Sequence, residues 1–163
     1  MNAFSLKTMT TQVVIAAIYV VFVLVFQFMS FQLIQFRIAE LLMVLVLFNP
    51  KHIVGLTIGC FLANLIGGAI LVDVIFGTLA TTLAAGLMIL LKSKPGIALI
   101  IPAVINGIVV GLILTYGYLL GPLWLTMGSV FIGEFVVMYT FGFVTYRVIK
   151  NNPHMLELIS SNR

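Results

Sequence analysis

The sequence predicts an all-α integral membrane protein, in which one bundle of six transmembrane helices forms a single domain. Its composition is the first indication. Hydrophobic residues make up 63% of the chain and charged residues only 7%, whereas soluble domains carry about 25% charged residues. The second indication is that the apolar residues fall into runs whose lengths approach a membrane span, which takes about 20 residues. A soluble fold of this composition would lack a water-compatible surface.

Breaks rich in charge, Pro or Gly separate six apolar segments. The segments cover residues 11–30, 37–48, 53–71, 73–91, 96–119 and 124–149, and a polar tail follows at residues 150–163. The first segment is too long for the core of a signal peptide, so we expect it to be retained. The second is short for a span, which favours a tilt, a locally thin bilayer or residues taken from the preceding loop. The tail is too polar to span.

The positions of the basic residues predict the orientation. With a cytoplasmic N-terminus, seven of the eight Lys and Arg residues fall on the inner side, namely Lys7, Lys51, Lys92, Lys94, Arg147, Lys150 and Arg163. Six spans then place both termini in the cytoplasm, as in a multi-pass protein of a prokaryotic cell membrane. Contact with the lipid bilayer therefore accounts for the net charge of +4 without a nucleic-acid partner.

Four ionisable residues gather in the outer half of the predicted bundle: Arg37, Glu40, Asp73 and Glu134. Arg37 and Glu40 share a helical face at i, i+3 spacing and form either an interfacial anchor or a pocket wall. Asp73 suits a helix N-cap as well as a solute contact. Glu134 lies roughly 15 Å along its helix from Trp124 at 1.5 Å per residue. A charge at that depth costs on the order of 2.5–3.5 kcal/mol. We therefore expect a polar pocket, open to the outside, for a hydrogen-bonding organic cation.

Further polar and aromatic residues complete the candidate pocket, and each also has a structural interpretation. The amides are Gln35, for which loop polarity is the structural interpretation, and Asn64 and Asn106, which would form interhelical hydrogen bonds. Near the outer ends an aromatic belt is expected, in which one or two residues could instead stack on a planar ligand; its members are Phe36, Tyr116, Tyr118 and Trp124. Phe76 is a further candidate for substrate binding. None of these residues is assigned an individual role.

Several classes of function lack their sequence signals. No GxxxxGK[ST] loop occurs, so ATP binding by that route is excluded. His52 and His154 are isolated and Cys60 is the single cysteine, so we expect no metal site and no disulfide framework. No Ser or Cys nucleophile has a His within reach on the outer side. The chain is therefore expected to need no cofactor and not to be an enzyme.

Four motifs resemble those of the QueT family, the queuosine-precursor-specific S components of energy-coupling factor (ECF) transporters. They are QFRIAELL at residues 35–42, GLTIGCFLANLIGG at 55–68, DVIFGTLATTLAA at 73–85 and GE at 133–134. The resemblance covers nearly the whole chain. It implies an S component that binds a 7-deazaguanine such as 7-aminomethyl-7-deazaguanine (preQ1) from outside. The acidic residues would bind the guanine edge and the ammonium, and Arg37 would bind the ring carbonyl or position Glu40.

The resemblance also implies partners, a membrane T component and two cytoplasmic ATPases. S components usually present an Ala-xxx-Ala patch on the first helix, but here Ala16 and Ala17 are followed by Val20 and Val21. The candidate docking residues are Ala16, Ala17, Gly55, Gly59 and Ala63. The last three form a ridge of small residues at four-residue spacing, which lets helices approach closely. The alternatives are an S component for another vitamin-like or amine solute, and a stand-alone small permease.

Overall fold

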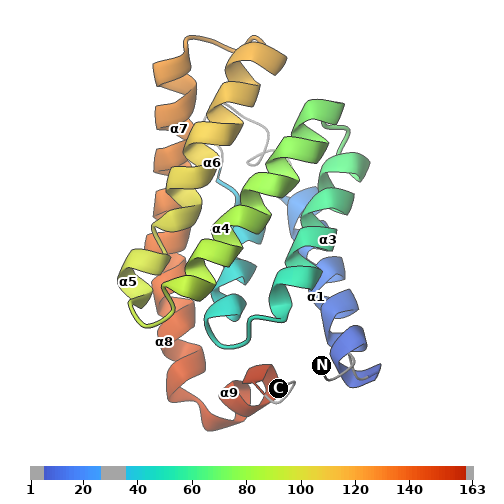
Figure 1. Cartoon of the computed structure of the whole chain (residues 1–163), viewed down its shortest axis with the longest axis vertical. Coiled ribbons are helices and arrows are strands. Elements are labelled where there is room, and N and C mark those ends of the chain that lie inside the picture. Colours follow the sequence, from blue (N-terminus) through green and yellow to red (C-terminus); the bar gives the residue numbers. More distant parts are fainter. Residues whose placement is uncertain (1–5, 27–35, 161–163) are drawn as a thin grey trace.

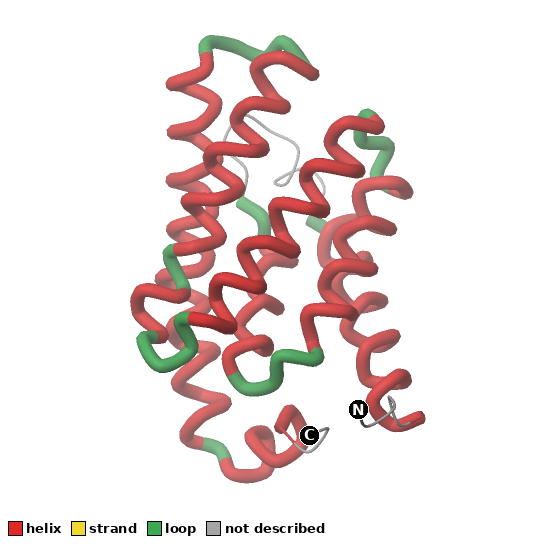
Figure 2. Tube along the Cα trace, viewed as in Figure 1, coloured by secondary structure: helices red, strands yellow, loops and turns green. Residues whose placement is uncertain are grey.

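The chain folds into a bundle of helices, seen in a computed structural model that describes residues 6–26 and 36–160 (Figures 1 and 2). In chain order the helices are α1 (Leu6–Val25), η1 (Ile38–Leu47), α3 (His52–Ile66), η2 (Asp73–Gly77), α4 (Thr78–Leu90), α5 (Pro95–Ala98), α6 (Ile101–Leu112), η3 (Ile113–Gly117), α7 (Leu123–Phe135), η4 (Val136–Gly142), α8 (Phe143–Asn151) and α9 (Pro153–Ser160). η1 is a 3₁₀ helix, and η2, η3 and η4 are π-helical turns that continue into their neighbouring helices. Within the described ranges there is no β-strand.

Four helical stretches are long and apolar enough to cross a membrane, namely Leu6–Val25, Asp73–Leu90, Pro95–Gly117 and Leu123–Asn151. Two shorter apolar helices, Ile38–Leu47 and His52–Ile66, complete the set. Each predicted segment overlaps one of these six. The all-helical class is therefore confirmed, while the number of spans and the side of the membrane on which the termini lie remain predictions.

Two helix ends differ from the predicted boundaries. The third helix ends at Ile66 rather than Leu71, because the chain turns at Gly68, whose φ of +79° lies in the left-handed region that favours glycine. The first helix begins at Leu6, earlier than predicted. The hydroxyl of Thr10 donates to the carbonyl of Leu6 at 3.0 Å, so this polar side chain is satisfied within the helix and does not interrupt it.

The second predicted segment forms the 3₁₀ helix η1 at the centre of the bundle. Its ten residues span about 20 Å at a rise of about 2.0 Å per residue, which lengthens a segment that looked short. Side chains at i and i+3 lie in line in such a helix, and Glu40, Met43 and Val46 are all fully buried. η1 contacts α1, α3, α4 and η4, so its charged end is surrounded by the other helices.

Glycines allow close packing of the two most extensively paired sets of helices, α1 with α3 and α6 with α7. A Cβ atom at Gly59 would lie 2.8 Å from the Cβ of Tyr19, and one at Gly111 would lie 2.7 Å from the Cα of Met127. No side chain fits at such distances, so these positions require glycine. The ridge of small residues in α3 therefore packs against α1 of the same chain.

The described chain begins and ends at the same end of the bundle, where α9 folds back beneath the other helices (Figure 1). The side chains of Asn49 and His52 contact the carbonyl oxygen of Ile159 at 3.3 and 3.1 Å. The polar tail predicted from the sequence thus contains a helix that is hydrogen-bonded to the loop after η1 and to the start of α3.

Candidate substrate-binding site

Glu40 lies at the centre of the bundle with its side chain fully buried, and three donors surround its Oε1 atom. The hydroxyls of Tyr19 and Thr81 donate to this atom at 2.8 and 2.9 Å. Arg37 Nη2 lies 3.0 Å from the same oxygen, which confirms that the two charges share a face. The side chain of Arg37 is only 11% exposed. An anchor at the membrane interface would be exposed, so this burial favours the interpretation as a pocket wall.

Hydrogen bonds continue from Glu40 into α3. The thiol of Cys60 donates to the Thr81 hydroxyl at 3.5 Å, and Asn64 Nδ2 donates to the Cys60 sulfur at 3.7 Å. These contacts connect η1, α4 and α3 through polar side chains in an otherwise apolar core. Each group gains a partner that lipid would not supply, and the network thereby orients the carboxylate of Glu40.

A second polar pair joins α6 and α7. Asn106 Nδ2 donates to Glu134 Oε1 at 2.8 Å, and both side chains are fully buried. The predicted interhelical hydrogen bond of Asn106 is therefore present, and its partner is the carboxylate that the sequence placed deep in the membrane.

Three buried acceptor atoms have no hydrogen-bond partner among the described residues: Glu40 Oε2, Asn106 Oδ1 and Glu134 Oε2. Leaving a buried polar atom unpaired costs about 1–3 kcal/mol, and more for a charged group. All three atoms accept hydrogen bonds when the acids are ionised. The site is thus arranged to receive hydrogen-bond donors.

Asp73 borders the same region from the start of η2. The hydroxyl of Tyr118 donates to Asp73 Oδ2 at 3.2 Å and in turn accepts the backbone N–H of Ile70 at 3.1 Å. A Cβ atom at Gly77 would lie 2.6 Å from Asp73 Oδ1 and 3.4 Å from Asn64 Nδ2. The Asp73 carboxylate therefore lies in the space that this glycine leaves open, with the Asn64 amide close by.

Arg37 is the cation that these acidic residues share. It interacts electrostatically with Glu40, Glu134 and Asp73. The structure thus brings together the four ionisable residues singled out in the sequence, whose formal charge is −2 when all are ionised. Among the described residues, no group of three or more His, Cys, Asp or Glu side chains is arranged to hold a metal ion.

The other candidate residues lie in different surroundings. Phe76, Tyr116 and Trp124 have exposed side chains, so the structure places them outside the buried cluster. Their exposure is what an aromatic belt at the membrane interface requires. Phe36 is half-buried and lines a small apolar cavity with residues of η1 and η4. Gln35 lies outside the described residues.

Three residues of the site were not among the sequence candidates: Tyr19, Thr81 and Tyr118. Thr81 lies within the DVIFGTLATTLAA motif, but nothing in the sequence singled it out there. Tyr118 was assigned to the aromatic belt. Tyr19 had no local signal, since its partner Glu40 belongs to a different helix.

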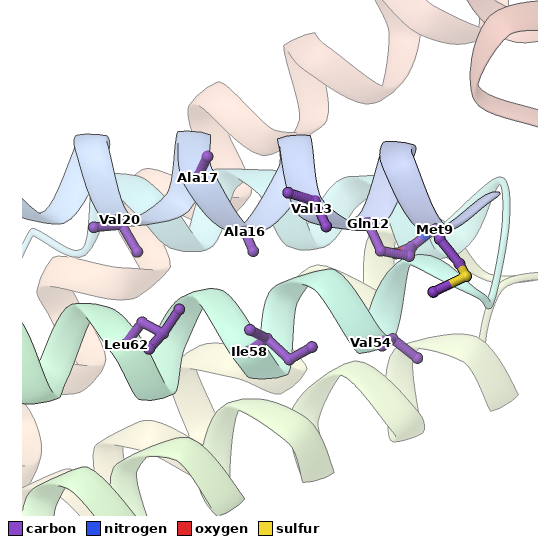
Figure 3. A pocket seen from close by; sticks show the side chains of 9 residues that line it. All are labelled: Met9, Gln12, Val13, Ala16, Ala17, Val20, Val54, Ile58 and Leu62. Atoms are coloured by element: carbon purple, nitrogen blue, oxygen red, sulfur yellow. The ribbon is translucent and has the colours of Figure 1, made fainter. Parts of the chain in front are cut away.

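Of the five candidate docking residues, Ala17 alone is exposed, and the other four are buried. Gly55, Gly59 and Ala63 are buried, with the two glycines against α1, which is the close helix packing that a ridge of small residues allows. Ala16 and Ala17 line an apolar groove of about 650 Å³ along α1 and α3 (Figure 3). The remaining lining residues are Met9, Gln12, Val13, Val20, Val54, Ile58 and Leu62.

Comparison with known proteins identifies the family. The family model described as QueT transporter matches residues 9–151. The chain is 36% identical over 86 residues to the queuosine precursor transporter QueT of Lactococcus lactis subsp. cremoris (strain MG1363). That match covers 52% of this chain and 50% of the relative, so it spans about half the length of the curated protein. No solved structure matches the chain significantly. Because the family model covers most of the sequence, this chain belongs to the QueT transporter family.

Proposed function

We propose that this chain is the substrate-binding S component of an ECF importer, which captures a queuosine precursor of the 7-deazaguanine type, such as preQ1, from outside the cell. Membership of the QueT transporter family supports a transport role. The name of the Lactococcus relative supports the class of substrate. The binding site that we propose is the buried cluster around Arg37, Glu40, Asp73 and Glu134.

The observation that carries this proposal is the set of unpaired buried acceptors. Glu40 Oε2, Glu134 Oε2 and Asn106 Oδ1 come from three different helices and have no partner among the described residues. Such atoms are destabilising unless a donor reaches them. A solute rich in N–H donors and carrying positive charge would satisfy them, and the excess negative charge of the cluster favours a cation.

The chemistry of preQ1 matches this requirement. Its aminomethyl group is an ammonium at neutral pH, with three N–H donors. Its guanine edge offers a ring N–H and an amino group as further donors and a carbonyl as an acceptor. Carboxylates form short, strong hydrogen bonds with such donors, and the Arg37 guanidinium suits the carbonyl.

The proposed partners are a membrane T component and two cytoplasmic ATPases, which would supply the energy for import. The apolar groove that contains Ala16 and Ala17 is the surface that we propose for the T component. The small side chain of Ala17 allows another helix to approach closely there, and close packing is one of the forces that drive helix association within a membrane. In this assignment the ridge of Gly55 and Gly59 packs against α1 within the chain and does not contact the partner.

The proposal is tested by calorimetric titration of the detergent-purified chain with preQ1. We expect saturable binding that is weakened in Glu134→Gln and Asp73→Asn. The matched control is Glu157→Gln, which neutralises an exposed carboxylate on α9 and is expected to bind as the wild type does. No binding by a folded sample, or equal binding by the two cluster variants, would contradict the proposed substrate.

A second experiment addresses the transport mechanism. The chain is reconstituted into proteoliposomes alone, and in parallel with a T component and its ATPases. We expect uptake of labelled preQ1 only in the complete system with ATP. Uptake by the chain alone without ATP would instead identify a stand-alone permease, and saturable binding of other amines in preference to preQ1 would indicate a different solute.

A further inference from the structure

The cluster contains two pairs of side chains that differ in hydrogen-bonding character. One pair is Arg37 with Glu40, at the centre of the bundle. The other is Asn106 with Glu134, between α6 and α7. Some donor and acceptor atoms of each pair already form hydrogen bonds within the protein. The remaining atoms are the ones that a ligand could contact.

The Arg37–Glu40 pair offers a donor next to an acceptor. Glu40 Oε1 already accepts from Tyr19, Thr81 and Arg37, so the acceptor that remains is Oε2. The guanidinium carries five N–H donors, and its contact with Glu40 uses Nη2. The charges of the two side chains compensate each other. This pair therefore matches a neutral ligand edge on which an acceptor and a donor lie side by side.

The Asn106–Glu134 pair offers acceptors alone. Asn106 uses Nδ2 to donate to Glu134 Oε1, which leaves Asn106 Oδ1 and Glu134 Oε2, both buried and unpaired. Among the described residues, no cationic side chain lies within salt-bridge distance of Glu134. This pair therefore matches a ligand group that has only donors and a positive charge.

We propose that the Asn106–Glu134 pair binds the ammonium arm of preQ1, and that the Arg37–Glu40 pair binds the adjacent carbonyl and ring N–H of its guanine edge. This assignment rests on the function proposed above and makes Asn106 and Glu134 the residues that select an aminomethyl base. An ammonium has three donors, so it can reach both unpaired acceptors of the α6–α7 pair at once. The guanine carbonyl would be repelled there, because it would face acceptor atoms.

The test compares two ligands that differ only in the arm, preQ1 and 7-cyano-7-deazaguanine, whose nitrile is a neutral acceptor. Glu134→Gln keeps the shape of the side chain and the acceptor for Asn106, but it removes the charge and turns the free atom into a donor. We expect this variant to bind preQ1 about 10- to 100-fold more weakly, the range for a lost charged hydrogen bond, and to bind the nitrile base at least as tightly as the wild type does.

Glu40→Gln is the matched comparison, since it removes the same charge at the other pair. We expect it to weaken both ligands by similar factors, because both carry the same guanine edge. If Glu134→Gln does not fold, Asn106→Leu removes one acceptor and is expected to weaken preQ1 more than the nitrile base.

The outcomes separate this assignment from the proposed function. If the folded wild type binds neither ligand, the function and the assignment both fail. If it binds preQ1 but Glu134→Gln and Asn106→Leu weaken both ligands equally, or leave preQ1 binding unchanged, the function stands and the assignment is wrong. If Glu40→Gln spares the nitrile base while Glu134→Gln weakens both, the two ends of the ligand are reversed.

Discussion

The Tyr19 hydroxyl donates a 2.8 Å hydrogen bond to Glu40 Oε1 from the buried face of α1, whereas Ala17 on the same helix faces the apolar groove. α1 thus contacts the candidate substrate site on one side and borders the candidate docking surface on the other. A shift of this helix would therefore alter both surfaces. The ridge of Gly55 and Gly59 packs closely against the helix and holds it on α3.

Tyr19→Phe tests the importance of this hydrogen bond. The change removes one of three donors to a buried carboxylate, so we expect the free energy of unfolding to fall by about 1.5–3 kcal/mol, the range for a hydrogen bond to a charged group. Unfolding by SDS in mixed micelles measures the difference. Tyr139→Phe removes a hydroxyl from an exposed side chain and should change stability little. Equal stability of the two variants would show that the Tyr19 hydroxyl contributes nothing.

Gly59→Ala tests the close contact between α1 and α3. The added Cβ would lie 2.8 Å from the Cβ of Tyr19 and 3.0 Å from the Cα of Ala16, so the helices must separate. We expect a loss of about 1–3 kcal/mol, which is typical of overpacking. Gly86→Ala is the control, because a Cβ there meets no atom within 4 Å and alanine favours a helix. The midpoint of thermal unfolding should fall in the first variant and hold or rise in the second.

Gly77→Ala probes the position of Asp73 without changing its charge. The new methyl group would overlap Asp73 Oδ1, which lies 2.6 Å from the Cβ position, but this oxygen is the end of a side chain that can rotate. We therefore expect nearly normal stability and weaker binding of preQ1 in calorimetry. Unchanged affinity would indicate that the Asp73 carboxylate does not contact the solute. A variant that does not fold would show that the carboxylate cannot move.

Ala17→Trp tests the groove as a docking surface. A large side chain would fill the space along α1 while leaving the buried cluster untouched. We expect normal binding of preQ1 by the isolated chain and loss of copurification with the T component and ATPases. Val144→Trp, on an exposed face of α8, is the control and should preserve assembly. Normal assembly of Ala17→Trp would place the docking surface elsewhere.

Some features of the site could be predicted from the sequence because they depend on local properties. Charges are so rare in this chain that Arg37, Glu40, Asp73 and Glu134 stood out, and the predicted topology placed all four in the outer half of the bundle. This placement predicted that the four would lie near one another, and the structure shows Arg37 ion-paired with Glu40.

The sequence by itself determined the all-helical class, the approximate helices, the rare buried charges and the family motifs. Only the tertiary structure decided which faces of the helices point inward. In a soluble helix an apolar stripe reveals the inner face, but lipid-facing and core-facing residues are both apolar here. For this reason Phe76, Tyr116 and Trp124 could not be recognised as exposed, nor Tyr19 as a partner of Glu40. The packing of Gly55 and Gly59 against α1 likewise could not be predicted, because a local sequence pattern does not show which helix lies against them.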